Sequence, residues 1–212
     1  MSHHRLDRLV SATRRTIKSG LEDPSADAPL LERALTALDT AEASSSHEDS
    51  KRVEASDWVR SALDFAGPSP ASELAAAIAD AANNLSWTVP YLDYDEPDIV
   101  SLRNDYLVAT LVGTDARSSA HLHSDVASIF FSVQRPNVFY PSHVHKAAEI
   151  YYPVAGTAMW TKGAESPTPQ TPGTWINHPT GTCHAMETLT EPLLCLAIWT
   201  TDLSSIPVIV RA

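Results

Sequence analysis

The sequence predicts a mainly β protein, an antiparallel barrel or sandwich that follows a helical N-terminal segment. From Trp87 onward the chain consists of short runs rich in β-branched and aromatic residues, which Pro, Gly, Asn and Asp interrupt. Such runs are typical of strands. Before Trp87, apolar residues recur at the spacing of amphipathic helices. Strands and helices do not alternate along the chain, so a parallel sheet is not expected.

Three or four short helices are expected within residues 5–84. The apolar stripes that indicate the first helices lie at residues 6–17, 30–38 and 58–65. Ser69 followed by Pro70 suits an N-cap and a first turn, which predicts a fourth helix over residues 71–83. The apolar faces of these helices are expected to pack against each other or to cover a neighbouring sheet.

The rest of the chain is expected to form the barrel. The predicted strands lie at residues 106–112, 128–133, 149–154, 157–161, 174–177 and 193–201. This organisation predicts two parts, a helical N-terminal extension over residues 1–85 that packs on a barrel over residues 86–212.

Composition narrows the classes of partner. The 212 residues carry 15 Lys and Arg against 26 Asp and Glu, a formal net charge of −11. Such a charge gives no general attraction to phosphate backbones or anionic lipid, so neither nucleic acid nor membrane is expected as a partner. No stretch approaches the roughly 18 consecutive apolar residues of a membrane span. We expect a cytoplasmic protein of one or at most two domains that acts on a small molecule.

Two imidazoles and a carboxylate share one face of a predicted strand. His143 and His145 are two residues apart, and Glu149 and Tyr151 keep the same parity. Because side chains alternate between the two faces of a strand, these four side chains are expected to point the same way.

A second group of residues adds another imidazole. Gly173, Pro179 and Gly181 belong to a turn-rich stretch that ends at His184. Three His and one Glu make a mixed nitrogen and oxygen ligand set, which suits a divalent transition metal and leaves coordination positions open. His178 lies inside this stretch, where it either orients a ligand or is a solvated turn residue.

These residues resemble the two motifs of the cupin family. The first motif, HxHx₃Ex₆G, runs from His143 to Gly156, and the second, Gx₅PxGx₂H, runs from Gly173 to His184. Asn137 stands where a Gly usually opens the first motif, and Thr188 stands where an Asn usually ends the second. Asn also adopts left-handed backbone angles, so the first departure is mild. The resemblance implies a cupin β-barrel, also called a double-stranded β-helix.

A narrower resemblance links the chain to the cupin-type dimethylsulfoniopropionate lyases, especially those of the Q type. It spans about residues 105–203. The residues that carry it are Tyr140 to His145, Glu149 to Tyr151, Trp160, Gly173 to Trp175, His184 to Met186, Pro192 to Leu194 and Trp199. The helical extension before the barrel is also similar to that group's layout.

The resemblance implies a reaction and a set of site residues. The reaction splits dimethylsulfoniopropionate into dimethyl sulfide and acrylate. The implied metal ligands are His143, His145, Glu149 and His184. Tyr151 matches a tyrosine implicated as the base, and Tyr140 matches a second active-site tyrosine. A homodimer is an expectation at the level of the family.

The implied chemistry can be compared with the residues themselves. A proton must leave the carbon α to the carboxylate while a neutral sulfide leaves the β carbon. A phenol beside a bound cation loses its proton more easily, so Tyr151 is expected either to take the α proton or to ligate the metal until substrate displaces it. Tyr140 precedes His143 by three residues and has the opposite parity in an ideal strand, unless Pro141 breaks that parity.

A sulfonium cation prefers aromatic faces, which suggests several contacts for the substrate. The candidates are Phe131, Tyr152, Trp160, Trp175 and Trp199, together with His178. Spacing does not choose among them, and each aromatic side chain could equally belong to the core.

Two other functions stay open at this point. An Fe(II) oxygenase acting on a small carboxylate could use a similar ligand set. A metal-stabilised binding protein without catalysis could use it too, because the barrel hosts many functions. The ligand types do not choose among Zn, Fe(II), Mn, Co and Ni.

Overall fold

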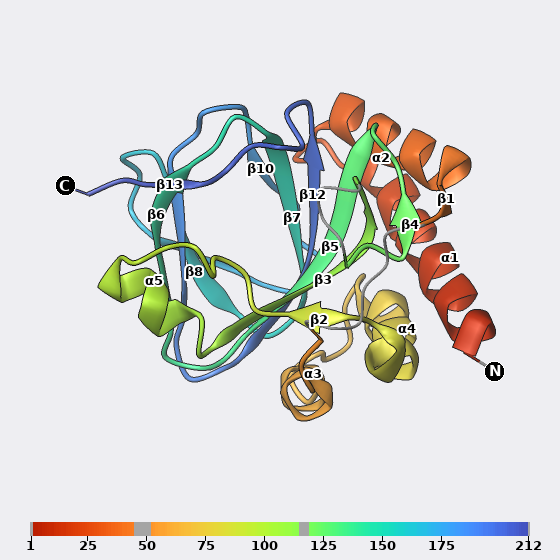
Figure 1. The fold of residues 1–212 in the computed structure, drawn as a ribbon, viewed down its shortest axis with the longest axis horizontal. Helices are drawn as coiled ribbons and strands as arrows, with labels where there is room; N and C mark the ends of the chain where they lie inside the picture. Colours follow the sequence, from red (N-terminus) through yellow and green to blue (C-terminus); the bar gives the residue numbers. More distant parts are fainter. Residues whose placement is uncertain (1, 45–51, 115–118, 212) are drawn as a thin grey trace.

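The fold consists of two facing β-sheets with helices on the outer side of one of them (Figure 1). The computed structural model describes residues 2–44, 52–114 and 119–211. Strands outnumber helices, and most of the helical residues precede the barrel strands. The predicted mainly β fold of the cupin type is confirmed.

Four α-helices lie within residues 2–81 of the described part of the chain. They are α1 (Ser2–Gly20), α2 (Ala28–Thr40), α3 (Ser56–Leu63) and α4 (Ser72–Ala81), followed by a 3-10 turn at Ala82–Asn84. Asp27 caps α2 by accepting a hydrogen bond from the backbone N–H of Leu30. The fourth helix begins later than predicted, because Ser69 accepts a hydrogen bond from the backbone of Ala71 within the preceding turn and does not cap the helix.

The larger sheet has eight strands in the described part of the chain, in the order β1-β4-β3-β5-β12-β7-β10, with β2 also paired to β3. Their bounds are β1 (Glu42–Ala43), β2 (Trp87–Thr88), β3 (Tyr106–Gly113), β4 (Leu122–His123), β5 (Ala127–Gln134), β7 (Ala148–Ala155), β10 (Ile176–His178) and β12 (Leu193–Thr200). Only the β3–β4 pair is parallel among these. β1 pairs with β4, so the N-terminal segment that the sequence predicts to be helical also contributes one short strand to this sheet.

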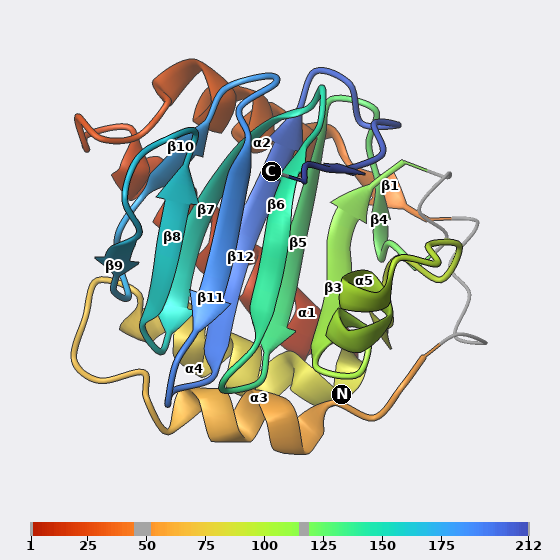
Figure 2. The same ribbon diagram turned by 90° about the vertical axis from the view of Figure 1, so that its left-hand side faces the viewer.

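The smaller sheet has five antiparallel strands among the described residues, in the order β13-β6-β11-β8-β9 (Figure 2). Their bounds are β6 (Phe139–Val144), β8 (Ala158–Lys162), β9 (Thr168–Gln170), β11 (His184–Thr188) and β13 (Val208–Ile209). A short helix that the sequence did not predict, α5 (Pro97–Leu102), packs beside β6.

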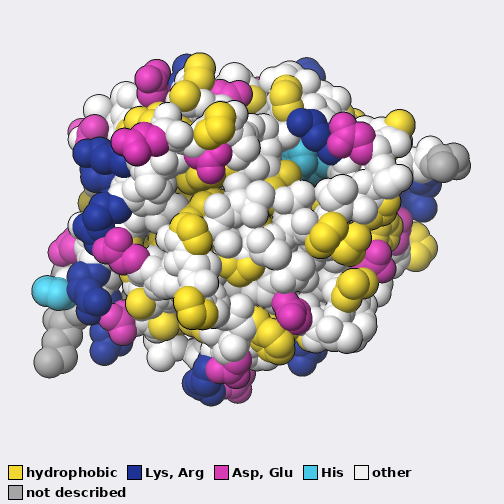
Figure 3. Space-filling view, turned by 180° about the vertical axis from the view of Figure 1, so that it is seen from behind, with side chains coloured by type: hydrophobic (Ala, Val, Ile, Leu, Met, Phe, Trp, Pro, Cys, Tyr) yellow, Lys and Arg dark blue, Asp and Glu magenta, His cyan; other side chains and the backbone are white. Residues whose placement is uncertain are grey.

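The helices bury the outer face of the larger sheet. α2 packs on β5, β7 and β12, α3 packs on β5 and β12, and α4 packs on β7. α1 lies over α2 and α4, and its Arg8 and Arg15 pair with Asp80 and Glu73 of the α4 region. Figure 3 shows basic and acidic side chains interleaved along this edge of the molecule. None of the described helices has the length and apolar character that crossing a membrane requires.

The two departures from the cupin motifs meet in the turn between β5 and β6. Asn137 has a left-handed backbone, with φ of 59°, as the sequence analysis expects of an Asn at this position. The Thr188 hydroxyl accepts a hydrogen bond from the backbone of Val138 and donates one to the carbonyl of Arg135. Thr188, which replaces the Asn that usually ends the second motif, thus binds the β5–β6 turn through its hydroxyl.

Candidate metal centre

The registers of the two sheets bring the motif residues to the inner face of each sheet. In the larger sheet, Glu149 of β7 lies directly between Trp199 of β12 and His178 of β10. In the smaller sheet, His143 of β6 is paired with His184 of β11. His145 follows β6 in the turn that leads to β7. The four predicted ligands therefore converge between the sheets, and each is at most 5% exposed.

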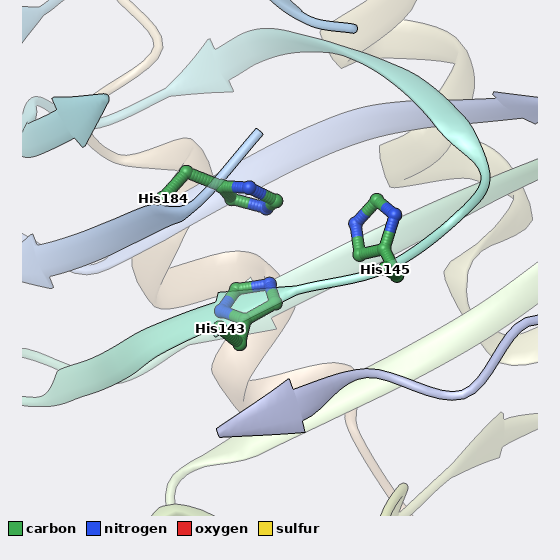
Figure 4. Close-up of side chains that lie close together, drawn as sticks. All are labelled: His143, His145 and His184. Atoms are coloured by element: carbon green, nitrogen blue, oxygen red, sulfur yellow. The ribbon is translucent and has the colours of Figure 1, made fainter. Parts of the chain in front are cut away.

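Three backbone carbonyls fix the orientation of the imidazole rings. The Nδ1 atoms of His143, His145 and His184 lie 2.8, 2.9 and 2.9 Å from the carbonyl oxygens of Pro141, Ala147 and Thr182. Because a carbonyl oxygen only accepts, each Nδ1 donates, and each Nε2 is left with a lone pair. Figure 4 shows the three rings turned toward one another, and one nitrogen from each lies within 4.8 Å of the others.

The Glu149 carboxylate lies against two of these lone pairs. Its Oε2 atom is 3.0 Å from Nε2 of His145 and 3.1 Å from Nε2 of His184. With both Nδ1 atoms donating elsewhere, neutral rings bring only acceptors to this point. Lone pairs that face a carboxylate oxygen repel it, and a cation between them removes this repulsion. Nitrogen and carboxylate ligands suit a divalent transition metal. The residues present therefore fit a bound metal ion.

The charge states of the cluster agree with that fit. Burial lowers the pKa of His143 to about 3, and the neighbouring His184 adds to the effect, so this ring is neutral and can act as a ligand. Burial raises the pKa of Glu149, but hydrogen bonding and positive charge at His145 and His184 outweigh that effect and hold the pKa well below its usual range. In the metal-free chain a proton on one of these rings supplies that charge, and a bound cation would supply it instead. Glu149 is thus an ionised carboxylate.

A cavity of about 470 Å³ opens onto the cluster. His143, Glu149 and Tyr151 form part of its wall, and the loops at 88–94 and 203–207 border it. The volume is in the range of small-molecule sites. Tyr94 joins the two loops by donating its hydroxyl to the Pro207 carbonyl.

Tyr151 faces this cavity, as its parity with Glu149 predicts. Its hydroxyl makes no hydrogen bond within the described residues. Burial raises the pKa of Tyr151 well above its usual value, and the charge of Glu149 raises it further. In the chain alone this phenol therefore keeps its proton at neutral pH.

Tyr140 also lines the cavity, because β6 bulges between it and His143. His184 pairs with His143 and Met186 pairs with Tyr140, so two residues of β11 span three of β6. The extra residue changes the parity at Pro141–Ser142. Tyr140 consequently stacks flat on His143, with ring centroids 4.3 Å apart and planes 8° from parallel, and its hydroxyl hydrogen-bonds that of Tyr91.

The predicted aromatic contacts divide between the cavity and the core. Trp199 lines the cavity and donates its indole N–H to Glu149 Oε1. Phe131, Tyr152 and Trp175 lie instead in the apolar core between the larger sheet and the helices. Tyr152 directly follows Tyr151, so strand alternation turns it to the opposite face. These three side chains therefore occupy the core, which is the other position that the sequence analysis leaves open for them.

Other aromatic residues line the cavity in their place. Phe130, one position before Phe131, lies in a cross-strand row with Ala197 and Tyr151. Tyr106, like Val108 and Thr110, points from β3 into the cavity. Strand alternation could have placed these three residues on one face from the sequence. Further wall residues that the sequence analysis missed are Tyr91 and Tyr94, which lie in a loop without periodic pattern.

His178 and Trp160 lie behind this wall. Trp160 contacts Tyr151, with ring centroids 4.8 Å apart, but is not part of the cavity lining. His178 is 1% exposed, so it is not a solvated turn residue. Its ring stacks on His184, and its Nδ1 is 3.9 Å from Glu149 Oε2. Glu149, His178 and His184 also have ligand atoms within 4.8 Å of one another.

Comparison with known proteins gives a family match. The model of a family described as dimethylsulfoniopropionate lyase matches residues 28–195. The dimethylsulfoniopropionate lyase DddQ of Ruegeria pomeroyi is 34% identical over 86 residues, which make up 41% of this chain and 43% of that protein. The matched segment thus spans less than half the length of that relative.

Solved structures match over almost the whole chain. A structure described as belonging to the dimethylsulfoniopropionate lyases RdDddP and RnDddQII has a TM-score of 0.70 at 21% identity and covers 100% of both chains. The crystal structure of DddQ from Ruegeria pomeroyi has a TM-score of 0.69 at 21% identity, over 92% of this chain and 96% of that one. At such identity these matches show the shared fold.

Proposed function

Because this chain belongs to the dimethylsulfoniopropionate lyase family, we propose that it cleaves dimethylsulfoniopropionate to dimethyl sulfide and acrylate. The observation that carries the proposal is the wall of the cavity. There, His143 and Glu149 of the metal-competent cluster adjoin Tyr151, whose hydroxyl makes no hydrogen bond within the described residues.

We propose that the site holds one divalent transition metal ion. Its ligands are the Nε2 atoms of His143, His145 and His184 and the Oε2 atom of Glu149. When bound, the ion supplies Lewis-acid polarisation of the substrate carboxylate and lowers the pKa of a neighbouring phenol. Zn, Fe(II), Mn, Co and Ni all suit this ligand set.

Tyr151 is the proposed base of the elimination. Its deprotonated oxygen takes the proton from the α carbon of the substrate, and the electron pair of that C–H bond forms the new carbon–carbon double bond. The bond from the β carbon to sulfur breaks at the same time, and its electron pair leaves with the sulfur as neutral dimethyl sulfide. Tyr151 then returns the proton to water through the cavity.

The aromatic wall is proposed to hold the sulfonium end of the substrate. Phe130 and Trp199 pack edge to face, with ring centroids 6.0 Å apart, and both line the cavity close to Glu149. A cation over aromatic faces is stabilised by their quadrupoles, and the neutral sulfide product loses that attraction. The same wall therefore favours release of the product.

The proposal is tested with purified protein that is stripped of metal and reloaded with each of the five ions in turn. Dimethylsulfoniopropionate is added, and dimethyl sulfide and acrylate are measured in the same sample, with a chelated sample as control. We expect equal amounts of both products and loss of both on chelation. Release of neither product with any ion would overturn the proposal, and oxygen uptake on turnover would indicate an oxygenase instead.

A further inference from the structure

His178 is a buried imidazole whose nitrogens both lack a partner. Neither Nδ1 nor Nε2 makes a hydrogen bond within the described residues, although the side chain is 1% exposed. Buried polar atoms in native proteins nearly always have partners, and a neutral imidazole brings one N–H and one lone pair. Two unpaired nitrogens on one ring beside a metal-competent cluster therefore require an explanation.

The stacking geometry excludes His178 as a second ligand beside His184. The two rings lie 4.0 Å apart between centroids, with planes 9° from parallel. The lone pair of an imidazole lies in the plane of its ring. Because the two rings are stacked, their lone pairs lie in separate planes, and a metal ion held by His184 would not also be reached by His178.

The neighbours of His178 complement its two nitrogens. Its Nδ1 is 3.9 Å from Glu149 Oε2, and the two residues lie directly opposite each other in the β7–β10 register. Trp160 is a second neighbour of His178, with ring centroids 6.1 Å apart and planes 25° from parallel. The indole N–H of Trp160 is also buried and makes no hydrogen bond within the described residues. His178 thus has one acceptor and one unpaired donor as neighbours, which matches its own N–H and lone pair.

We propose that His178 is a positioning residue at the centre of a hydrogen-bond chain, in which Trp160 donates to its Nε2 and its Nδ1–H donates to Glu149 Oε2. The 3.9 Å between His178 Nδ1 and Glu149 Oε2 is longer than a hydrogen bond, and a small movement of the side chains closes it. The inference rests on the metal site of the proposed function.

This hydrogen-bond chain gives each unpaired nitrogen of His178 a partner: an acceptor for the Nδ1–H and a donor for Nε2. It also completes the restraint on Glu149, because Trp199 already donates to the other carboxylate oxygen, Oε1. With a donor on each oxygen, the carboxylate is held in one orientation toward the three imidazoles. Hydrogen bonds of this kind to ligating carboxylates strengthen metal binding.

Two variants of His178 separate hydrogen bonding from packing. His178→Asn keeps an N–H donor close to the position of Nδ1 but loses the aromatic ring. His178→Phe keeps a ring that can stack on His184 but has no nitrogen. The measurement is the dissociation constant of Co²⁺ by competition with a chelator, together with the visible absorption of the bound Co²⁺, without substrate.

We expect Co²⁺ affinity to fall about 10- to 100-fold in His178→Phe, with a changed visible spectrum, and to stay close to that of the parent in His178→Asn. Parent-like affinity in His178→Phe would overturn the proposal, and so would equal weakening in both variants, which indicates packing alone. If His178→Phe does not fold, His178→Gln replaces it, because its amide reaches toward Nε2 and away from Glu149.

Trp160→Phe tests the other end of the chain. We expect it to weaken Co²⁺ binding in the same direction, and we expect the double variant with His178→Phe to bind no more weakly than His178→Phe alone, because both changes break one chain. Additive losses would overturn the proposed link. Since no substrate is present, these results stay interpretable even if the lyase assay fails.

Discussion

Trp199 donates its indole N–H to Glu149 Oε1 across the β7–β12 register, from a ring that also lies 4.5 Å from the ring of His145. One side chain thus shapes the cavity and holds a proposed ligand. In the anionic state of Glu149 this hydrogen bond is charge-assisted, and such bonds contribute about 1.5–3 kcal/mol.

Trp199→Phe removes this hydrogen bond but keeps an aromatic ring on the cavity wall. We expect metal affinity to fall about 10-fold or more, because the carboxylate loses one of the donors that orient it. The check is metal titration of the stripped protein. Trp87→Phe is the matched control, since its indole N–H donates to the Ala82 carbonyl in the helix-side core. Equal metal affinity in the parent and in Trp199→Phe would show that Trp199 does not orient the Glu149 carboxylate for metal binding.

Tyr151→Phe is expected to keep the metal and to lose turnover. All four proposed ligands survive the change, while the proposed base is gone. A general base contributes about 100- to 10,000-fold to rate, so kcat should fall by that range with little change in metal content. Metal analysis and product release on the same preparation provide the check. Turnover equal to that of the parent would show that the base lies elsewhere.

Tyr140→Phe removes a hydroxyl while keeping the ring that stacks on His143. Its hydroxyl hydrogen-bonds that of Tyr91, a loop residue with a left-handed backbone, φ 62°. We expect Tyr140→Phe and Tyr91→Phe to lower kcat/KM to a similar extent, and the double variant to lose no more than either alone. Fully additive losses would indicate that the two hydroxyls act independently.

The convergence of the His and Glu side chains could be predicted from the sequence because its signals are local. Strand alternation gives the shared face of Glu149 and Tyr151, and motif spacing gives the convergence with His184. Asn137 takes the left-handed backbone that the sequence analysis allows for it. The position of Tyr140 could not be settled in this way, because it depends on a bulge between two strands far apart in sequence.

The aromatic wall of the cavity was harder to predict, because aromatic residues occur in the core and in cavity walls equally well. Phe130 and Phe131 are chemically identical neighbours, and only the pairing of β5 with β12 decides which one faces inward. Tyr91 and Tyr94 reach the cavity through a loop, where neither a helical nor a strand period applies. The packing of His178 against His184 likewise depends on two sheets meeting.

These two phenylalanines provide a matched pair of variants. Phe131→Ala opens a hole in the core and is expected to lower the free energy of unfolding by about 3–5 kcal/mol. Phe130→Ala removes part of the cavity wall and is expected to raise KM about 2- to 30-fold, the equivalent of a cation–π contact, with a smaller loss of stability. Urea unfolding and steady-state kinetics on both variants give the comparison. If Phe130→Ala instead caused the large loss of stability and Phe131→Ala raised KM, then Phe131 rather than Phe130 would face the cavity.

The stability of the metal-free protein is expected to fall as the pH falls below about 6.5, the ordinary pKa of an unfolded histidine. Burial holds the pKa of His143 at about 3 in the fold, with His184 adding to the effect, and burial lowers that of His178 to about 2. Because both folded-state values lie below the unfolded value, the unfolded chain takes up these protons first. The stability present above about pH 6.5 is therefore lost progressively toward pH 3.

Each such group contributes a slope of at most about 1.4 kcal/mol per pH unit. Urea unfolding of the metal-free protein at several pH values between about 7.5 and 5 measures the combined slope. His143→Phe should make that slope shallower, because it removes the ring whose protonation the fold resists. Glu149 does not interfere, because a carboxylate with a depressed pKa loses its contribution only below about pH 4.3. A slope that is unaffected by His143→Phe would mean that this ring does not resist protonation in the folded protein.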